Sequence, residues 1–130
     1  ANFDVLLDPI YFGSGNTLYE SIVYGTPIVT WPGPFMRGRI VAGAYRQIGL
    51  DDAPVVLRLE DYAPLALALG SNAGRRRILR EAIGRLGRSL FEDHQSVSDF
   101  EAFLEAAVRA AARAEKLPGS WRPDARNTED

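Results

Sequence analysis

The sequence predicts an α/β fold in which helices cover a parallel sheet. Two apolar segments, residues 5–9 and 28–31, have the continuous hydrophobic character of strands buried on both faces. A segment with helical spacing, residues 16–24, lies between them. A strand, a helix and a strand in this order form a right-handed crossover with parallel strands. The loop before the helix is therefore expected at the carboxyl edge of the sheet, where open α/β sheets bind their ligands.

The loop between the first strand and this helix is the candidate binding site. Gly13 and Gly15 allow positive φ and close backbone approach. Ser14, Asn16 and Thr17 are residue types that cap helix N-termini. Free N–H groups next to the positive end of a helix dipole bind phosphate, so a nucleotide is the first ligand to consider. The alternative is a helix that is merely well capped, since a lone glycine-rich turn is a weak signal.

Glycine and proline residues mark the ends of the first helix and of the second strand. Leu18, Ile22 and Val23 give the helix an apolar face, and Gly25 is typical of a helix end. The strand that follows is entered through a proline, which is tolerated only at a strand's first residue or at an edge. Residues 32–34, Pro-Gly-Pro, then break the chain at the same edge as the loop. We expect them to form a second wall of the ligand pocket.

The middle of the chain predicts one more helix and one more strand. Residues 35–48 have helical spacing, with Arg37 and Arg39 near the start. These arginines could meet a phosphate or carboxylate in the cleft, and the alternative is a solvated basic face. Residues 55–57 are expected to be a short buried strand. A further helix opens at residues 60–62, where acidic residues suit the helix dipole.

The C-terminal region predicts two amphipathic helices packed on the sheet, residues 75–91 and 98–114. The three arginines of residues 75–77 are interpreted as a solvated face. His94, between the two helices, is interpreted as a cap or surface residue. Residues 118–130 form a polar tail, which is expected to be mobile unless Trp121 docks on the protein.

Composition narrows the classes of function. The chain has 130 residues, 46% of them hydrophobic, a formal net charge of −2 and no cysteine, which together predict one soluble, cytoplasmic domain without disulfides. A slightly acidic chain argues against nucleic acid or an anionic membrane as a partner. A single histidine without cysteine offers no metal site.

Familiar nucleotide-binding motifs are absent. The loop does not fit Gly-x-Gly-x-x-Gly, because Leu18 occupies the third glycine's place, and it lacks the Gly-Lys-Ser/Thr ending of a Walker loop. Glu20, one turn into the helix, could accept hydrogen bonds from the two hydroxyls of a ribose whose phosphate is held by the loop. The alternative is that Glu20 only complements the positive end of the helix dipole.

These residues resemble the second half of the C-terminal domain of GT-B glycosyltransferases. The chain is most similar to bacterial relatives of O-linked N-acetylglucosamine transferase, the SPINDLY-like family that often follows TPR repeats. The resemblance covers roughly residues 4–117 and rests on the strand at residues 4–8, the loop, Glu20, and two runs that follow, Tyr-Gly-Thr-Pro-Ile-Val-Thr-Trp-Pro-Gly and Arg-Ile-Val-Ala-Gly-Ala. It implies a partial Rossmann-like sheet, with residues 1–117 forming the C-terminal part of a nucleotide-sugar-binding domain.

The resemblance also implies a function. Gly13, Ser14, Gly15, Asn16 and Thr17 would bind the diphosphate of a UDP-sugar such as UDP-GlcNAc, and Glu20 its ribose. At the position of Gly15, the SPINDLY-like family commonly has histidine. Transfer to a hydroxyl, on a protein Ser/Thr or a small molecule, would need no metal or other cofactor, and no residue is assigned as catalytic. The acceptor domain and TPR repeats would precede Ala1, so this piece alone is expected to be inactive.

Two other functions stay open at this point. One is a nucleotide-sugar epimerase of the same GT-B architecture. The other is a non-catalytic domain that binds phosphate or docks a partner.

Overall fold

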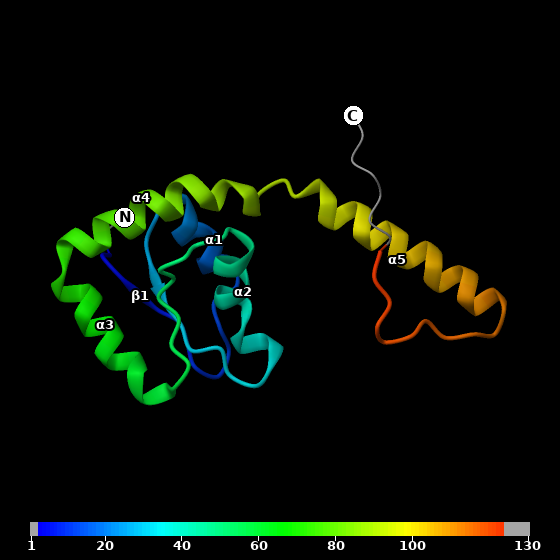
Figure 1. The fold of residues 1–130 in the computed structure, drawn as a ribbon, viewed down its shortest axis with the longest axis horizontal. Coiled ribbons are helices and arrows are strands. Elements are labelled where there is room, and N and C mark those ends of the chain that lie inside the picture. The colour runs from blue at the N-terminus through cyan, green and yellow to red at the C-terminus, as the bar shows by residue number, and fades with distance from the viewer. Residues whose placement is uncertain (1–2, 124–130) are drawn as a thin grey trace. The chain divides into compact units, whose positions relative to one another are not determined.

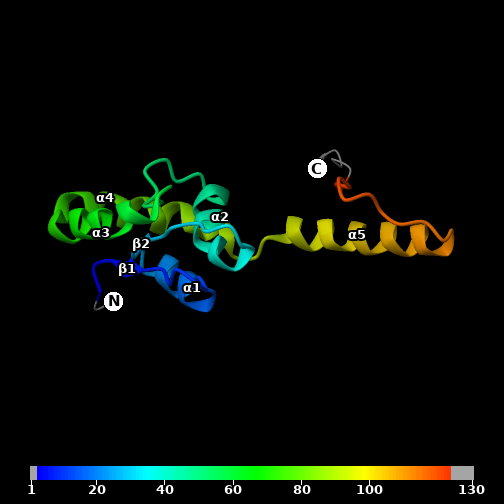
Figure 2. The ribbon, with the colours of Figure 1, turned by 90° about the horizontal axis from the view of Figure 1, so that it is seen from below.

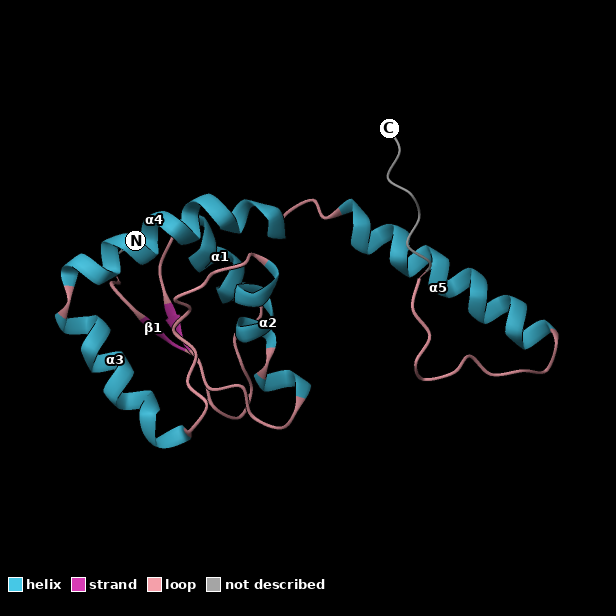
Figure 3. Cartoon of the chain, viewed as in Figure 1, coloured by secondary structure: helices cyan, strands magenta, loops and turns pink. Residues whose placement is uncertain are grey.

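The computed structural model describes residues 3–123 of the chain. The chain divides into two compact units, Ala1–Phe91 and Glu92–Asp130. Figure 1 labels the helices and the first strand, and Figure 3 colours the chain by type of element. The elements, in chain order, are β1 (Leu6–Leu7), α1 (Asn16–Val23), β2 (Ile28–Val29), the 3₁₀ turn η1 (Met36–Gly38), α2 (Ile40–Gln47), η2 (Leu59–Asp61), α3 (Tyr62–Ser71), α4 (Ala73–Leu86), η3 (Gly87–Leu90) and α5 (His94–Ala112).

The sheet of the first unit is parallel, as the sequence predicts. Leu6 pairs with Ile28 and Leu7 with Val29. Helix α1 connects the two strands, and it lies on one side of them in Figure 2, with α3 on the other. The predicted α/β class is therefore confirmed.

The third predicted strand, residues 55–57, is only partly correct. Val55 forms an isolated parallel bridge with Thr30. The N–H of Val56 donates to the carbonyl of Thr30 at 2.9 Å, and the side chain of Val56 is buried. Leu57 is 89% exposed, so the prediction of a buried strand is wrong at this residue. The chain turns away towards η2 immediately after its last bond to the sheet.

The second predicted helix begins later than its spacing indicated. Phe35 has extended backbone angles, φ −100° and ψ 145°, and the one turn that follows it is 3₁₀. The α-helical part, α2, starts at Ile40. The carbonyl of Arg37 in this turn accepts the N–H of Gly13 at 2.8 Å, so a contact with a distant loop, which spacing cannot show, holds the turn apart from α2. Ala44 and Ile48 are buried as expected, whereas Ile40 is 37% exposed.

The core of the first unit lies between the strands and helices α1 to α4. Leu18 and Ile22 are buried on α1, which confirms its predicted apolar face, but Val23 is 64% exposed. The helix ends as expected before Gly25, which has a φ of +66°. The buried core cluster consists of Leu18, Ile22, Ile28, Val29, Val41, Ala44, Tyr45, Ile48, Leu69, Leu79 and Ile83.

Helix α4 carries the three arginines interpreted as a solvated face. Arg75 forms an ion pair with Asp52, its Nη2 lying 3.0 Å from Oδ1. Nε of Arg76 lies 3.7 Å from Oδ1 of Asp4, and Nη1 of Arg76 donates to the carbonyl of Leu69 at 2.9 Å. Two of the three arginines therefore connect α4 to other segments, and the solvated-face interpretation is wrong for them.

The second unit consists of α5 and the segment that follows it. Asp93 caps α5 by accepting hydrogen bonds from the N–H groups of Gln95 and Ser96, at 3.1 and 3.3 Å. His94 is the exposed first residue of this helix, which begins four residues before its predicted start. The ring of Trp121 contacts that of Phe103 edge-on, with the centroids 5.6 Å apart. Trp121 thus docks within its own unit, and the part of the predicted tail at residues 124–130 lies outside the described residues.

None of the helices within residues 3–123 combines the length and apolarity that a membrane span needs. Within the same range no three His, Asp or Glu side chains are grouped as metal ligands.

Candidate functional site

The loop that follows β1 is held by the buried carboxylate of Asp8. This side chain lies at the carboxyl end of β1 and is 3% exposed. Its Oδ1 accepts the N–H of Ser14 at 2.7 Å, and its Oδ2 accepts the hydroxyl of Thr30 at 2.6 Å. One residue therefore connects the loop to the segment after β2.

Gly13 is a glycine because the backbone approaches closely here. Its N–H donates to the carbonyl of Arg37 at 2.8 Å. A Cβ at this position would lie 3.0 Å from that carbonyl oxygen and 3.3 Å from Oδ2 of Asp8, so a larger residue would push both neighbours away. The prediction of close approach is correct for Gly13.

Gly15 has a different role from the one expected. It is the N-cap of α1, with φ −97°, and a Cβ there would meet nothing within 4 Å. Among the described glycines, only Gly25 and Gly49 have a positive φ. The expectation of positive φ in the loop is therefore wrong, and the loop is shaped by its hydrogen bonds rather than by left-handed glycines.

The N-terminus of α1 presents N–H groups that nothing in the described part of the chain accepts. No side chain among the described residues caps this helix, although Ser14, Asn16 and Thr17 are capping types. The N–H groups of Gly13 and Ser14 are bonded to Arg37 and Asp8, whereas those of Gly15, Asn16 and Thr17 have no acceptor in residues 3–123. The first turn also lacks an acidic residue. These three groups and the helix dipole together favour an anion.

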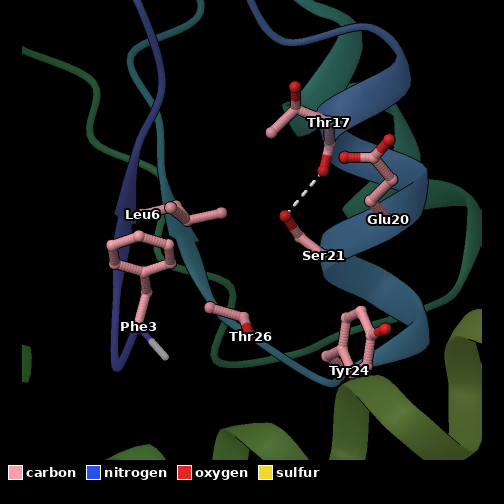
Figure 4. A pocket seen from close by; sticks show the side chains of 7 residues that line it. All are labelled: Phe3, Leu6, Thr17, Glu20, Ser21, Tyr24 and Thr26. Atoms are coloured by element: carbon pink, nitrogen blue, oxygen red, sulfur yellow. Dashed lines mark hydrogen bonds between the residues drawn. The ribbon is translucent and has the colours of Figure 1, made fainter. Parts of the chain in front are cut away.

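Glu20 lies on the wall of a pocket of about 460 Å³ beside α1. Figure 4 shows the side chains of Thr17, Glu20, Ser21 and Tyr24 along α1. The hydroxyl of Ser21 donates to the carbonyl of Thr17 at 2.6 Å, whereas the exposed carboxylate of Glu20 has no hydrogen bond or ion pair within residues 3–123. The pocket is lined by Phe3, Leu6, Thr17, Glu20, Ser21, Tyr24 and Thr26.

Sequence reasoning identified two of these wall residues, Thr17 and Glu20. Ser21 lies four residues after Thr17 and Tyr24 four residues after Glu20, so helical spacing could have found both on this face of α1. Phe3 and Leu6 come from the β1 segment, and Thr26 precedes β2. Only the parallel pairing of the strands brings these three residues opposite α1.

The predicted second wall, residues 32–34, belongs to a different pocket. Gly33 and Pro34 line a pocket of about 230 Å³ together with Tyr11, Trp31 and Arg37. Its lining and that of the Glu20 pocket share no residue. The expectation of one pocket with two walls is therefore wrong.

The two arginines near α2 behave differently. Nε of Arg37 donates to the carbonyl of Tyr11 at 3.0 Å, and its guanidinium lies over the ring of Phe35, 4.5 Å from the centroid. With its own carbonyl bonded to Gly13, Arg37 joins the two loops at the carboxyl edge. The exposed side chain of Arg39 has no hydrogen bond or ion pair in residues 3–123, which is the solvated alternative.

Tyr62 contacts the start of the loop, although the sequence did not indicate a role for it in the site. Its hydroxyl donates to the carbonyl of Asp8 at 2.7 Å, across 54 residues of sequence. Partial burial and the nearby charge of Asp8 both raise the pKa of Tyr62, so its hydroxyl stays protonated and remains a donor. Helix α3 therefore also anchors the start of the loop.

Comparison with known proteins agrees with the predicted fold. Among solved structures, the chain is similar to a mutant of the O-GlcNAc transferase from Thermobaculum terrenum, with 35% sequence identity and a TM-score of 0.66. The match covers 86% of this chain and 21% of that chain, so this chain spans about a fifth of that protein's length. No protein-family model matches the chain, and the curated proteins contain no significant match.

Proposed function

We propose that this chain is part of the nucleotide-sugar-binding domain of a glycosyltransferase. In this proposal the N-terminus of α1 binds the diphosphate of a UDP-sugar, and Glu20 binds the ribose. The observation that carries it is a combination on one short helix: three N–H groups that have no acceptor among residues 3–123, and a carboxylate in a pocket that has no partner in the same range. The similarity to an O-GlcNAc transferase supports it.

The diphosphate contacts would come from the backbone. Gly15, Asn16 and Thr17 offer consecutive N–H groups, and the first turn of α1 has no carboxylate to compete with a ligand. When the sugar leaves its donor, negative charge builds up on the diphosphate. Fixed N–H dipoles stabilise such charge without having to reorient. The role of this chain in the reaction is thus to bind and stabilise the leaving group.

The ribose contact would come from Glu20. An ionised carboxylate only accepts hydrogen bonds, and the two hydroxyls of a ribose are donors that match it. Glu20 lies one helical turn after the N-terminal N–H groups and shares its pocket with Thr17. A nucleoside diphosphate could therefore extend from the helix N-terminus along α1 into the pocket.

The complete protein would transfer a hexose to a hydroxyl acceptor. GlcNAc is the sugar that fits the name of the solved neighbour. A protein Ser/Thr is the acceptor that the resemblance implies. The acceptor domain, and TPR repeats if present, would correspond to the part of the solved neighbour that this chain does not cover. No catalytic base is assigned within the chain.

An NMR titration of the isotope-labelled chain tests this proposal. UDP should shift the amide signals of Gly15, Asn16 and Thr17, whereas uridine, which lacks phosphate, should shift them far less. Glu20→Gln should weaken UDP binding, while Glu81→Gln, a change at an exposed carboxylate of α4, should leave it unchanged. Absence of UDP-induced shifts at the three amides would show that the diphosphate assignment is wrong.

A further inference from the structure

We propose that Asp8 is a positioning residue, which orients the loop so that the N–H groups of Gly15, Asn16 and Thr17 face one anionic ligand. This inference rests on the proposed function, because it assigns a role to a residue that supports the same site. Asp8 does not line the Glu20 pocket. Apart from its charge, it can therefore act on a ligand there only through the loop that it holds.

The contacts of Asp8 are those of a residue that fixes its neighbours. A carboxylate that is only 3% exposed is strongly disfavoured unless its oxygens accept hydrogen bonds, and both do so here. Ser14 in the loop and Thr30 after β2 are the two donors, and Tyr62 of α3 holds the backbone carbonyl of Asp8. Three separate segments therefore determine where this carboxylate lies.

The bond to Ser14 decides which N–H groups are left for a ligand. The N–H groups of Gly13 and Ser14 are bonded to protein acceptors, and those of the next three residues have none in the described part of the chain. Without Asp8, the N–H of Ser14 would lose its acceptor, and the loop would no longer be held at the residue before the N-cap. The three free N–H groups would then lose their common orientation.

Positioning and charge predict opposite effects of Asp8 on affinity. A negative charge close to an anion site weakens anion binding, whereas a well-oriented loop strengthens it. Asp8→Asn removes the charge but keeps an oxygen for the N–H of Ser14, and its amide can donate to the hydroxyl oxygen of Thr30. Asp8→Ala removes both acceptors. If Asp8 acts by positioning, the asparagine variant rescues binding and the alanine variant does not.

The test is an NMR titration of the full 130-residue chain with inorganic pyrophosphate, repeated with UDP. We expect Asp8→Ala to lower the affinity for both ligands about tenfold or more. The affinities of Asp8→Asn should stay within about threefold of those of the wild type. Hydrogen exchange of the Ser14 amide without ligand should accelerate in Asp8→Ala only. Ile83→Val, a change in the buried core on α4, is the control for lost stability and should not alter either affinity.

The outcomes separate the two proposals. If the wild type binds and Asp8→Ala binds equally well, or if Ile83→Val loses as much affinity, the role of Asp8 is wrong while the anion site stands. If the wild type binds neither ligand, the proposed function fails and this inference fails with it. Should Asp8→Ala not fold, Thr30→Val decides, since it removes the donor to Oδ2: unchanged affinity in that variant would overturn the positioning role, and a several-fold loss would support it.

Discussion

The hydroxyl of Tyr45 is hydrogen-bonded to both backbone polar groups of Ile28. It accepts the N–H of Ile28 at 2.7 Å and donates to the carbonyl of Ile28 at 3.1 Å. At this residue of β2, a tyrosine from α2 therefore occupies the place of a neighbouring strand. This contact joins a helix to the centre of the sheet, and Tyr45 itself is 1% exposed.

Tyr45→Phe should destabilise the fold. The change leaves the N–H and carbonyl of Ile28 buried without partners, at a cost of about 1–3 kcal/mol in the free energy of unfolding. Chemical denaturation of the two chains measures this difference. Tyr24→Phe is the control, because Tyr24 is 61% exposed and its hydroxyl has no hydrogen-bond partner in the part of the chain that the structure describes. Equal stability of the wild type and Tyr45→Phe would contradict the role given to this contact.

The stability of the chain should also fall at alkaline pH because of Tyr45. Burial raises the pKa of Tyr45 above its ordinary value of 10.0. A group whose pKa is raised on folding contributes stability that is complete below the unfolded pKa and is lost as the pH rises above it. Unfolding free energies measured from pH 8 to 11 should therefore decline above pH 10. The decline should be shallower in Tyr45→Phe, and an identical slope would exclude Tyr45 as its source.

Gly25→Ala should be more damaging than Gly49→Ala. The two glycines have the same left-handed backbone, with φ of +66° and +65°. Alanine in this conformation costs about 1–2 kcal/mol. At Gly25 the new Cβ would also lie 2.5 Å from the carbonyl oxygen of Arg80, while at Gly49 it would meet nothing within 4 Å. Melting temperatures of the two variants test the difference, and equal losses would mean that the contact with α4 relaxes without cost.

Glu20→Gln should lower affinity for UDP and leave stability almost unchanged. Loss of a charged acceptor from ribose hydroxyls corresponds to about 1.5–3 kcal/mol, or roughly ten- to a hundredfold in affinity. If Glu20 only complemented the helix dipole, removal of its charge would instead cost about 0.3–1 kcal/mol of stability and nothing in binding. Calorimetric titration with UDP and ligand-free melting temperatures distinguish these roles. The wild type should also prefer UDP to deoxy-UDP, and Glu20→Gln should not.

The chain by itself should transfer no sugar. Under the proposed function it would supply groups that bind a leaving group, but no residue is assigned as a general base, and the GT-B resemblance implies a catalytic cleft between two domains. Incubation of the chain with UDP-GlcNAc and a hydroxyl acceptor, followed by mass spectrometry, should give no product. Sugar transfer by these 130 residues alone would overturn this expectation and would require a base within the chain.

The sequence by itself determined the parallel strand–helix–strand unit, the loop before α1 and the end of α1 at Gly25. These features depend on apolar spacing and on glycine or proline within a few residues, so they are encoded locally. The same reasoning named Thr17 and Glu20 of α1 as candidate ligand residues. The sequence predicted too early a start for α2 and a buried Leu57, and both predictions are wrong because spacing alone decides neither feature.

Only the tertiary structure decided how the loop is held and which residues face Glu20. Asp8 meets Thr30 across 22 residues and Tyr62 across 54, and Tyr45 meets Ile28 across 17. Nothing in the local pattern of a carboxylate or a tyrosine specifies such a distant partner. These contacts exist because strand pairing and helix packing bring the segments together, and a polar group that is buried in this way must then find its hydrogen bonds among the neighbours it is given.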